Sequence, residues 1–355
     1  MRDGGCKVAR RASGRAVSVA DLQVDSSILS PRLVRIASML AYAVALTCWV
    51  TVMGLPRQAL PAFVWIWLAT IAWNFGAPLR SHLAFLRDWS LPLGVLTVYL
   101  YSRGLADDLG FVSVHVTAPI EVDRWLFGGT LPTEFLQAHL CGNPCEPTTP
   151  PHWYDLVLTT VYYSHFVVAL TIASVLWLRD RSAWVGFMRR YLSLNVLALV
   201  VYITYPMAPP WLAAQNGFVS GYVARITGRG WGHVHGGHFH QKLSAVGNPV
   251  AAMPSLHAGI ALFVALYGVS RLRRRWRWLL LLYPLAMSFM LVYYAEHYVI
   301  DILAGFAAAG LVLWGCAMWE RSRAPDRERA DSDQRQAWQA DGEPKTDEPA
   351  GAATG

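Results

Sequence analysis

The sequence predicts an all-α integral membrane protein, a bundle of about eight spans. The chain has 355 residues, of which 54% are hydrophobic and 16 are Trp, and this is too apolar for one soluble domain. A helical span needs about 20 mostly apolar residues to cross about 30 Å of hydrocarbon. The run that contains Pro92 and Arg103 is the weakest, because these residues shorten its apolar part. In order, the runs lie at 33–53, 59–75, 90–106, 154–178, 188–206, 255–270, 277–295 and 298–319.

Basic residues between alternate spans predict the orientation. With eight spans threaded in order, these residues all fall on one side, which is cytoplasmic by the positive-inside rule. We therefore expect a multi-pass protein of the cell membrane with both termini in the cytoplasm and no cleavable signal peptide. The net charge of +7 is explained by juxtamembrane clusters beside anionic lipid, so we expect no nucleic-acid partner. The basic residues are Arg80, Arg87, Arg179, Arg181, Arg189, Arg190 and the run RLRRRWR at 271–277.

The segments outside and within the bilayer divide the chain into four parts. Residues 1–30 form a basic, disordered N-terminus, and 31–84 contain two accessory spans. Residues 85–319 form a six-span core. The tail 320–355 is rich in Asp, Glu, Arg, Ala and Gly without apolar periodicity, so it is expected to be disordered in the cytoplasm. Two long loops, 107–153 and 207–254, face outward.

The first outward loop contains an amphipathic stretch, DRWLFGGTLPTEFLQ, at 123–137. It mixes aromatic and apolar residues with Asp123, Arg124 and Glu134. Such a stretch is typical of a short piece lying in the membrane interface. We favour a role in anchoring the loop over a direct part in substrate binding.

Two further loop motifs bear on disulfide or metal chemistry. CGNPC at 141–145 holds the only closely spaced pair among five cysteines. Its spacing permits a disulfide on an oxidising face without requiring one, and a metal site from two thiols is less favoured.

Four histidines lie in GWGHVHGGHFH at 230–240, but the Gly-rich spacing puts them on no common helix face. We expect a solvated loop there and no metal.

The stretch EHYVID at 296–301 places ionisable residues at the outer end of the last span. Residues four apart on a helix share a face, so Asp301 can accept a hydrogen bond from one nitrogen of His297. The other nitrogen is then free as a nucleophile or base. Burying Asp301 costs on the order of 2.5–3.5 kcal/mol, so it needs a partner. Glu296 points away from this face and receives no role.

A second histidine falls at the same depth in NPVAAMPSLHAGI, residues 248–260. Pro254 suits the first turn of a helix, Ser255 offers a hydroxyl donor, and His257 follows. The helix N-terminus favours an anion. This arrangement suits phosphoryl transfer, in which His297 attacks phosphorus and His257 protonates the leaving oxygen. The alternative is that each histidine is an ordinary interfacial residue.

These motifs resemble those of a known family. PSLH at 254–257 and EHYVID at 296–301 resemble motifs two and three of the type 2 phosphatidic acid phosphatase superfamily. DRWLFGG, YPMAPPW and NPVAAMPSLH look like its branch with inositol phosphorylceramide synthase and bacterial inositolphosphotransferase-like proteins. The likeness covers roughly residues 85–315. It implies a six-helix core with His297 as nucleophile, Asp301 orienting it, His257 as general acid and Ser255 as the motif-two serine.

The sequence departs from the superfamily pattern in its basic residues. Leu291 stands where many members have arginine, and the first motif, K-x6-R-P, is absent, although Lys242 stands seven before Pro249. Arg124 and Lys242 are the outward-loop candidates for binding phosphate, with ordinary solvated charge as the alternative for both. A phosphodiester, with one negative charge per phosphate, suits this thinner basic lining better than a monoester.

The sequence therefore predicts a membrane phosphotransferase that acts on a phospholipid or polyprenyl phosphate at the outer face through a phosphohistidine. The acceptor is an alcohol or water, and transfer of an inositol phosphate-like head group is preferred. A lipid phosphate phosphatase of the same fold is the first alternative. A transporter or lipid-binding scaffold, in which His297 and Asp301 relay protons, is the second. No cofactor is expected, because two histidines can manage the proton transfers.

Overall fold

The computed structural model describes most of the chain, and all regular structure in the described ranges is helical. Apart from isolated bridges among His115, Met207 and Ala251, these ranges contain no strand. The all-α prediction is confirmed. The predicted N-terminal segment 1–30, Lys242 and the histidines of 233–240 lie outside the described residues. The described residues are 31–54, 59–108, 113–146, 148–219, 223–232 and 250–342.

In the described ranges, six helices are long and apolar enough to cross a membrane, so this is a multi-pass membrane protein. Two further apolar helices, α2 (Ala59–Trp73) and α11 (Leu256–Arg271), are shorter than the usual span. All eight overlap predicted apolar runs, but α3 begins at Leu79 instead of residue 90, so Arg80 and Arg87 lie within this helix and not in a connection before it. The six long spans are α1 (Pro31–Met53), α3 (Leu79–Asp108), α6 (Trp153–Arg179), α7 (Arg181–Thr204), the pair η2 (Arg275–Leu281) and α12 (Leu282–Tyr293), and α13 (Val299–Gly342).

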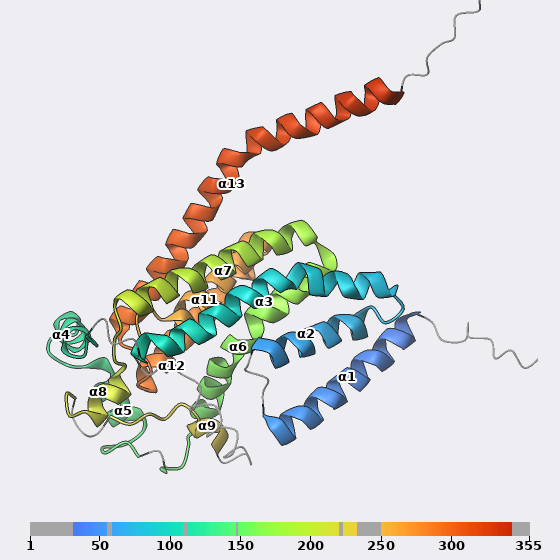
Figure 1. Ribbon diagram of the computed structural model, residues 1–355. Helices are drawn as coiled ribbons and strands as arrows, with labels where there is room; N and C mark the ends of the chain where they lie inside the picture. Colours follow the sequence, from blue (N-terminus) through green and yellow to red (C-terminus); the bar gives the residue numbers. More distant parts are fainter. Residues whose placement is uncertain are drawn as a thin grey trace, which may run out of the picture.

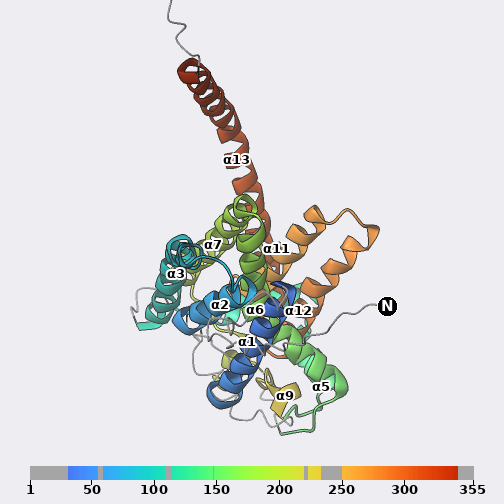
Figure 2. The same ribbon diagram turned by 90° about the vertical axis from the view of Figure 1, so that its right-hand side faces the viewer.

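The helices form a bundle with α1 and α2 packed as a hairpin on its flank (Figure 1). Helix α11 packs against α13, α12, α7 and α6 and is therefore central. Four short helices gather at one end of the bundle, and the turn between α11 and η2 lies at the other end (Figure 2). These short helices are α4 (Thr117–Leu126), α5 (Pro132–Leu140), α8 (Pro210–Gln215) and α9 (Arg229–Gly232).

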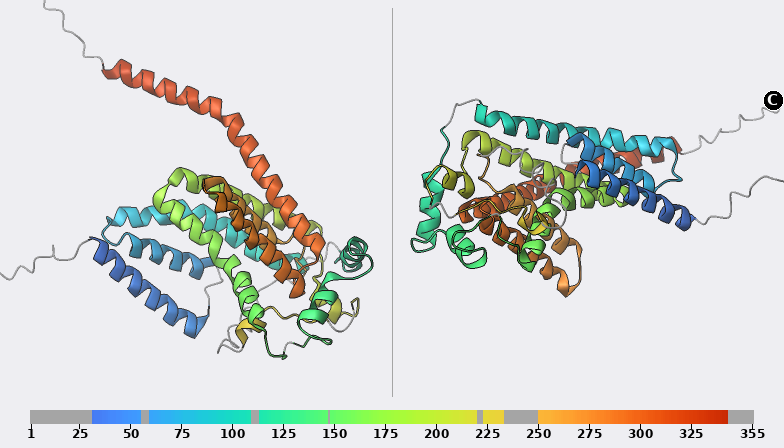
Figure 3. Two further views of the ribbon diagram at one scale, coloured as in Figure 1. Left: turned by 180° about the vertical axis from the view of Figure 1, so that it is seen from behind. Right: turned by 90° about the horizontal axis from the view of Figure 1, so that it is seen from below.

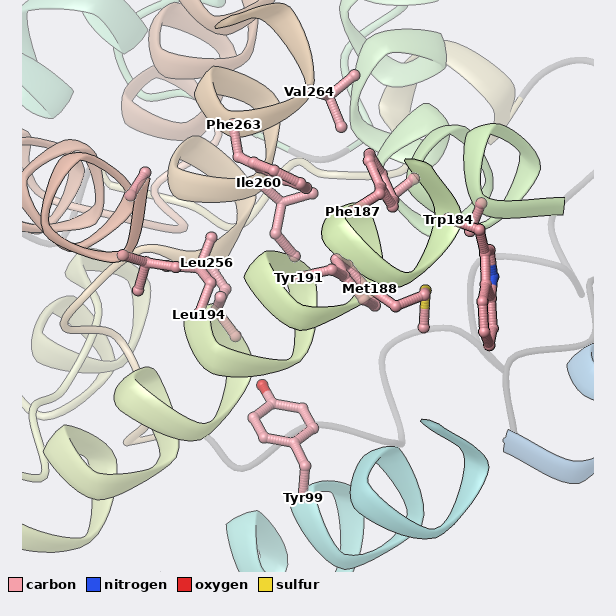
Figure 4. Packing of buried hydrophobic residues seen from close by; sticks show 14 of the residues in the cluster. Tyr99, Trp184, Phe187, Met188, Tyr191, Leu194, Leu256, Ile260, Phe263 and Val264 are labelled. Atoms are coloured by element: carbon pink, nitrogen blue, oxygen red, sulfur yellow. The ribbon is translucent and has the colours of Figure 1, made fainter. Parts of the chain in front are cut away.

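Large apolar side chains hold α11 to α7 below the site end of the bundle. Leu256 and Ile260 of α11 lie beside Leu194 and Tyr191 of α7 in one buried cluster (Figure 4). Each buried side chain of this size contributes roughly 1.5–3 kcal/mol by leaving water. Since bilayer lipid is also apolar, close packing rather than escape from water must supply much of the stabilisation here.

Ion pairs join the helix ends that carry the basic connections. Arg190 pairs with Glu320 at 2.6 Å, which ties the start of α7 to α13. Arg181 pairs with Asp88, which ties the same region to α3. The arginines of the α6–α7 connection therefore lie with those of α3 at one end of the bundle. The membrane side to which this end belongs stays a prediction.

Helix α13 extends beyond residue 319, where the predicted span ends. It continues as helix to Gly342 and projects away from the bundle (Figure 3). The reason is local: residues 320–342 are rich in Ala, Arg, Glu and Gln, which are strong helix formers. They lack an apolar stripe, and this absence led to the expectation of disorder.

The predicted amphipathic stretch 123–137 forms the end of α4, a turn and most of α5. Trp125, Phe127 and Phe135 are exposed, whereas Asp123 is fully buried. The exposed aromatic side chains suit a membrane interface. Cys141 and Cys145, just after α5, form a disulfide.

Candidate active site

The two predicted site segments meet because α11 and α13 cross at glycines. A Cβ on Gly305 would collide with the carbonyl oxygen of Ser255, and one on Gly259 would lie 2.9 Å from that of Gly305. This close approach lets the backbone N–H of Ser255 donate to the carbonyl of Asp301 at 2.9 Å. The backbone contact fixes the start of α11 against the first turn of α13.

The crossing brings the two predicted histidines together. His257 lies in the first turn of α11, and His297 lies in the turn that links α12 to α13. Their ring centroids are 5.7 Å apart, with ring planes at 59°. His297 is buried and His257 partly buried. No helix separates the rings, so one substrate atom can lie within reach of both.

Asp301 is fully buried beside His297. Its Oδ2 lies 3.4 Å from Nδ1 of His297 and accepts a hydrogen bond of 2.9 Å from the backbone N–H of Tyr298. The distance to His297 exceeds the usual 2.7–3.2 Å of an N–H···O bond, but contacts of this kind commonly tighten when substrate binds. One part of the prediction was wrong: His297 precedes α13 and shares no helix face with Asp301. The carboxylate instead lies beside the turn before the helix.

The turn that carries His297 is held by its backbone. The N–H groups of Glu296 and His297 both donate to the carbonyl of Leu291, at 3.0 and 3.2 Å. Ala295 has φ of 61°, a left-handed conformation that is uncommon outside glycine and costs of order 1–3 kcal/mol. Its carbonyl accepts from the N–H of Trp211 at 3.1 Å. Such strain persists only where the surroundings hold it, so the position of His297 is tightly determined.

Ser255 caps α11. Its Oγ accepts from the N–H of Ala258 at 3.3 Å, and its side chain is fully buried. Pro254 precedes this cap and so lies outside the helix, which corrects its predicted place in the first turn. Its carbonyl accepts from the hydroxyl of Tyr202 at 2.8 Å. The geometry thus gives Ser255 a capping contact, while its predicted contact with substrate stays a prediction.

Asp123 reaches from α4 to the first turn of α13. Its carboxylate accepts from the N–H groups of Val299 at 2.8 Å and Ile300 at 3.0 Å. Burial raises the pKa of Asp123 to about 6; the two hydrogen bonds oppose this and Asp301 adds to it. The amphipathic loop is therefore joined to the site by a buried carboxylate, which caps the helix that carries Asp301.

Of the two residues predicted to bind phosphate, Arg124 and Lys242, the structure describes only Arg124. Arg124 pairs with Glu134 at 3.7 Å, and its side chain is 42% exposed. Within the described part of the chain, Arg124 forms no ion pair with Asp301 and is paired only with Glu134. Lys242 lies outside the described part of the chain.

A different arginine, which the sequence did not single out, lies next to the site. Arg225 binds Glu296 through two bonds, Nε to Oε1 at 2.8 Å and Nη2 to Oε2 at 3.2 Å. Thr227 also donates its hydroxyl to Glu296, and the guanidinium lies over the ring of Trp211 at 4.7 Å. Glu296, expected to have no role, therefore holds an arginine beside His297.

Aromatic residues of α6 surround His257. Tyr162 stacks on its ring at 5.1 Å between centroids, and His165 lies at 4.2 Å. A histidine inside an apolar span is rare and usually functional, and that signal could have identified His165 from the sequence.

An apolar cavity of about 540 Å³ lies between α1, α2 and α6. Phe166 lines it and also faces the ring of His257, with centroids 6.0 Å apart. Further lining residues of α6 continue through Leu170 and Ser174 to Arg179 at its far end. The cavity therefore runs along α6 from the neighbourhood of His257 toward the end of the bundle that carries the basic connections.

Comparison with known proteins gives one family and one relative. Residues 146–315, which contain both histidines and Asp301, match the PAP2 superfamily. The chain is 26% identical over 177 residues to a protein of Bacteroides thetaiotaomicron named phosphoinositol dihydroceramide synthase. The matched part is 47% of this chain and spans 57% of that relative's length. No solved structure matches the chain.

Proposed function

Since the chain belongs to the PAP2 superfamily, we propose that it is a lipid phosphotransferase that works through a phosphohistidine on His297. The observation that carries this proposal is the pair of histidine rings 5.7 Å apart, with Asp301 beside one of them. Two imidazoles and a carboxylate can perform both proton transfers of a phosphoryl exchange.

In the first half-reaction, Nε2 of His297 attacks the phosphorus of the donor lipid. The bond from phosphorus to the leaving alcohol oxygen breaks, and protonated His257 gives its proton to that oxygen. Asp301 holds the proton on Nδ1 of His297, which keeps Nε2 available for attack. The N-terminus of α11 favours the negative charge of the phosphoryl oxygens.

In the second half-reaction, the oxygen of an acceptor attacks the phosphorus of the phosphohistidine. His257, now neutral, takes the proton of that oxygen, and the phosphorus–nitrogen bond breaks. His297 is regenerated and His257 is again protonated. With an alcohol as acceptor the enzyme is a transferase, and with water it is a phosphatase.

Several observations support a lipid donor. The apolar cavity along α6 suits a hydrocarbon chain. Its volume of about 540 Å³ lies within the range of roughly 300–1,000 Å³ that is usual for ligand sites. The ring of Phe166 lies between that cavity and His257. The name of the Bacteroides relative supports transfer of an inositol phosphate-like head group over simple hydrolysis. Phosphatidate hydrolysis is the alternative.

The proposal includes an orientation. Eight helices cross the bilayer, six of them as the catalytic core, and the end that carries α4, α5, α8 and α9 faces outward. Both termini are then cytoplasmic, as the basic connections at the opposite end favour. Reporter fusions after residues 140 and 275 should report opposite sides of the membrane.

The chemistry is tested with purified protein and labelled phosphoinositide, phosphatidate and polyprenyl phosphate. At least one should be turned over, and His297→Ala should abolish both turnover and acid-labile labelling of the protein. His257→Ala should lower the rate by about 10² to 10⁴, the usual contribution of a general acid. His139→Ala, at an exposed position on α5, is the control. Equal activity of wild type and His297→Ala on every lipid that reacts would rule out this nucleophile.

A further inference from the structure

The site lacks a positive charge at the position where the superfamily motif suggests one. Leu291 is fully buried in an apolar cluster that also contains Tyr162, Tyr163 and Ala258. An arginine there would need a partner in this cluster. The phosphate charge must therefore be met by a cation that arrives from another part of the chain.

Arg225 belongs to the second outward loop, and hydrogen bonds to the neighbouring residue hold its backbone in place. Gln137 of α5 is buried and binds both sides of Ala224, accepting from its N–H at 2.9 Å and donating to its carbonyl at 2.7 Å. Gln137 also donates to the carbonyl of Tyr293 at 2.9 Å. The residue before Arg225 is thus tied to the end of α12, immediately before the turn that carries His297.

The neighbours of Arg225 keep its guanidinium charged. Burial alone would lower the pKa of Arg225, but Glu296 and the phenols of Tyr162 and Tyr163 together raise it, so the guanidinium stays charged. Glu296 directly precedes His297. Tyr162 is the ring that stacks on His257. Arg225 is therefore bound to the residue that directly precedes His297.

One edge of the guanidinium remains for a ligand. Nε and Nη2 are engaged by Glu296, and Trp211 covers a face. Within the described part of the chain, no hydrogen bond is formed by Nη1. The Arg225 side chain is 30% exposed, against 10% for Glu296. A guanidinium held on one edge and one face is preorganised to bind a phosphate oxygen with the rest.

We propose that Arg225 binds a non-bridging oxygen of the substrate phosphate and that Glu296 sets the charge which the site accepts. The Arg225–Glu296 pair has no net charge, so a second negative charge on phosphorus meets the Glu296 carboxylate without a matching cation. The site then prefers a phosphodiester, which carries one charge, over a phosphomonoester, which carries up to two. This inference rests on the proposed phosphotransferase function and names the substrate class.

The first experiment measures kcat and KM of Arg225→Gln and Arg225→Lys with phosphatidylinositol in detergent micelles. Arg225→Gln should lower kcat/KM by about 10² to 10³, as removal of one donor to a developing oxyanion does elsewhere. Lysine keeps the charge but not the forked geometry, so Arg225→Lys should recover only part of the activity. Arg87→Gln is the control, because Arg87 is an exposed arginine near the start of α3 and pairs with Asp88, which also binds Arg181 at the start of α7.

The second experiment measures selectivity. Glu296→Gln keeps the shape of the side chain but removes its charge, so the rate ratio of phosphatidate to phosphatidylinositol should rise about tenfold, which equals 1.4 kcal/mol. If the pair had only a structural role, Glu296→Gln would lower the rates with phosphatidate and with phosphatidylinositol by the same factor. The double variant Arg225→Gln/Glu296→Gln leaves no unpaired charge, so it stays testable if a single variant fails to fold.

The outcomes separate the two proposals. If wild type turns over none of the phosphate esters, the proposed function itself fails. If wild type is active and the folded Arg225→Gln or double variant retains its kcat/KM, only the role of Arg225 is overturned. If Glu296→Gln leaves the rate ratio unchanged, the charge selection is wrong. A loss in Arg225→Gln with an altered ratio in Glu296→Gln supports both parts.

Discussion

Two arginine–carboxylate pairs lie on one short segment, and they differ in burial. Arg225 and Glu296 have side chains 30% and 10% exposed. Arg229 and Asp155, 3.5 Å apart, have side chains 1% and 0% exposed. Arg229 further donates to the sulfur of Cys141 at 2.6 Å and to the carbonyl of Pro150 at 2.8 Å.

The difference in burial separates an ion pair that holds the fold together, Arg229–Asp155, from one that can also bind a ligand, Arg225–Glu296. The buried pair binds the first outward loop and the start of α6 to the second loop, and its charges meet only protein atoms. In the open pair, Glu296 binds one edge of the Arg225 guanidinium, and the Arg225 side chain stays 30% exposed. A sealed pair contributes little net stability yet is costly to break, whereas an open pair can exchange water for a ligand.

The largest expected effect comes from breaking the sealed pair. Arg229→Met leaves the Asp155 carboxylate buried without its cation, so the free energy of unfolding should fall by about 3–5 kcal/mol. Unfolding in mixed micelles, followed by tryptophan fluorescence, measures this loss. Activity per folded molecule should stay close to that of wild type.

Arg225→Met is the matched variant for that test. Glu296 keeps its bond from Thr227 and some access to water, so the stability loss should be smaller while the activity loss is larger. If the two variants lose stability and activity in the same proportions, the division between a sealed and an open pair is wrong.

Asp123 extends the comparison to a sealed carboxylate bound by backbone N–H groups. Its folded pKa of about 6 lies above its ordinary value of 3.8, so between these pH values the folded protein holds a proton that the unfolded chain has released. Stability from this group is therefore greatest below about pH 4 and falls as pH rises through 6, by about 3 kcal/mol at most. Wild type should lose more stability than Asp123→Asn between pH 4 and pH 7, as measured by thermal unfolding. If stability changes with pH equally in wild type and Asp123→Asn, the raised pKa of Asp123 is wrong.

The sequence was sufficient for those parts of the site that depend on local pattern. Apolar runs of about twenty residues are a property of neighbouring residues, and the helices follow them. The threading of the spans was enough to expect His257 and His297 at one level, which agrees with their 5.7 Å separation. Helix α13 continues to Gly342, beyond the predicted span end at residue 319, because helix propensity does not require an apolar stripe.

Arg225 could not be predicted from a local sequence pattern. Arg225 and Glu296 are 71 residues apart, and their contact depends on an irregular loop folding back onto the turn before α13. Glu296 was given no role because His297 and Asp301 were expected on one continuous helix, which would point Glu296 elsewhere. The helix begins instead at Val299, and the turn aims Glu296 at the loop.

A smaller effect tests whether the backbone crossing positions the histidines. Gly305→Ala places a Cβ against the carbonyl of Ser255, so α13 must move from α11 at a cost of about 1–3 kcal/mol. The shift should move His257 away from His297, so kcat should fall while KM changes little. Gly310→Ala on the same helix meets nothing within 4 Å and is the control. Equal kinetics for both variants would show that the crossing does not set the site.

The smallest effect concerns Ser255, which is sealed like Asp155 although the family motif suggests contact with substrate. If capping α11 is its role, Ser255→Ala should cost about 1 kcal/mol of stability, while Ser255→Gly should cost only a few tenths. Both variants lack the hydroxyl, so a capping role predicts that Ser255→Gly keeps the wild-type KM for phosphatidylinositol. A raised KM in Ser255→Gly, at unchanged stability, would mean that a fully buried hydroxyl reaches the phosphate. Burial alone would then fail to distinguish the structural polar groups of this site from those that bind substrate.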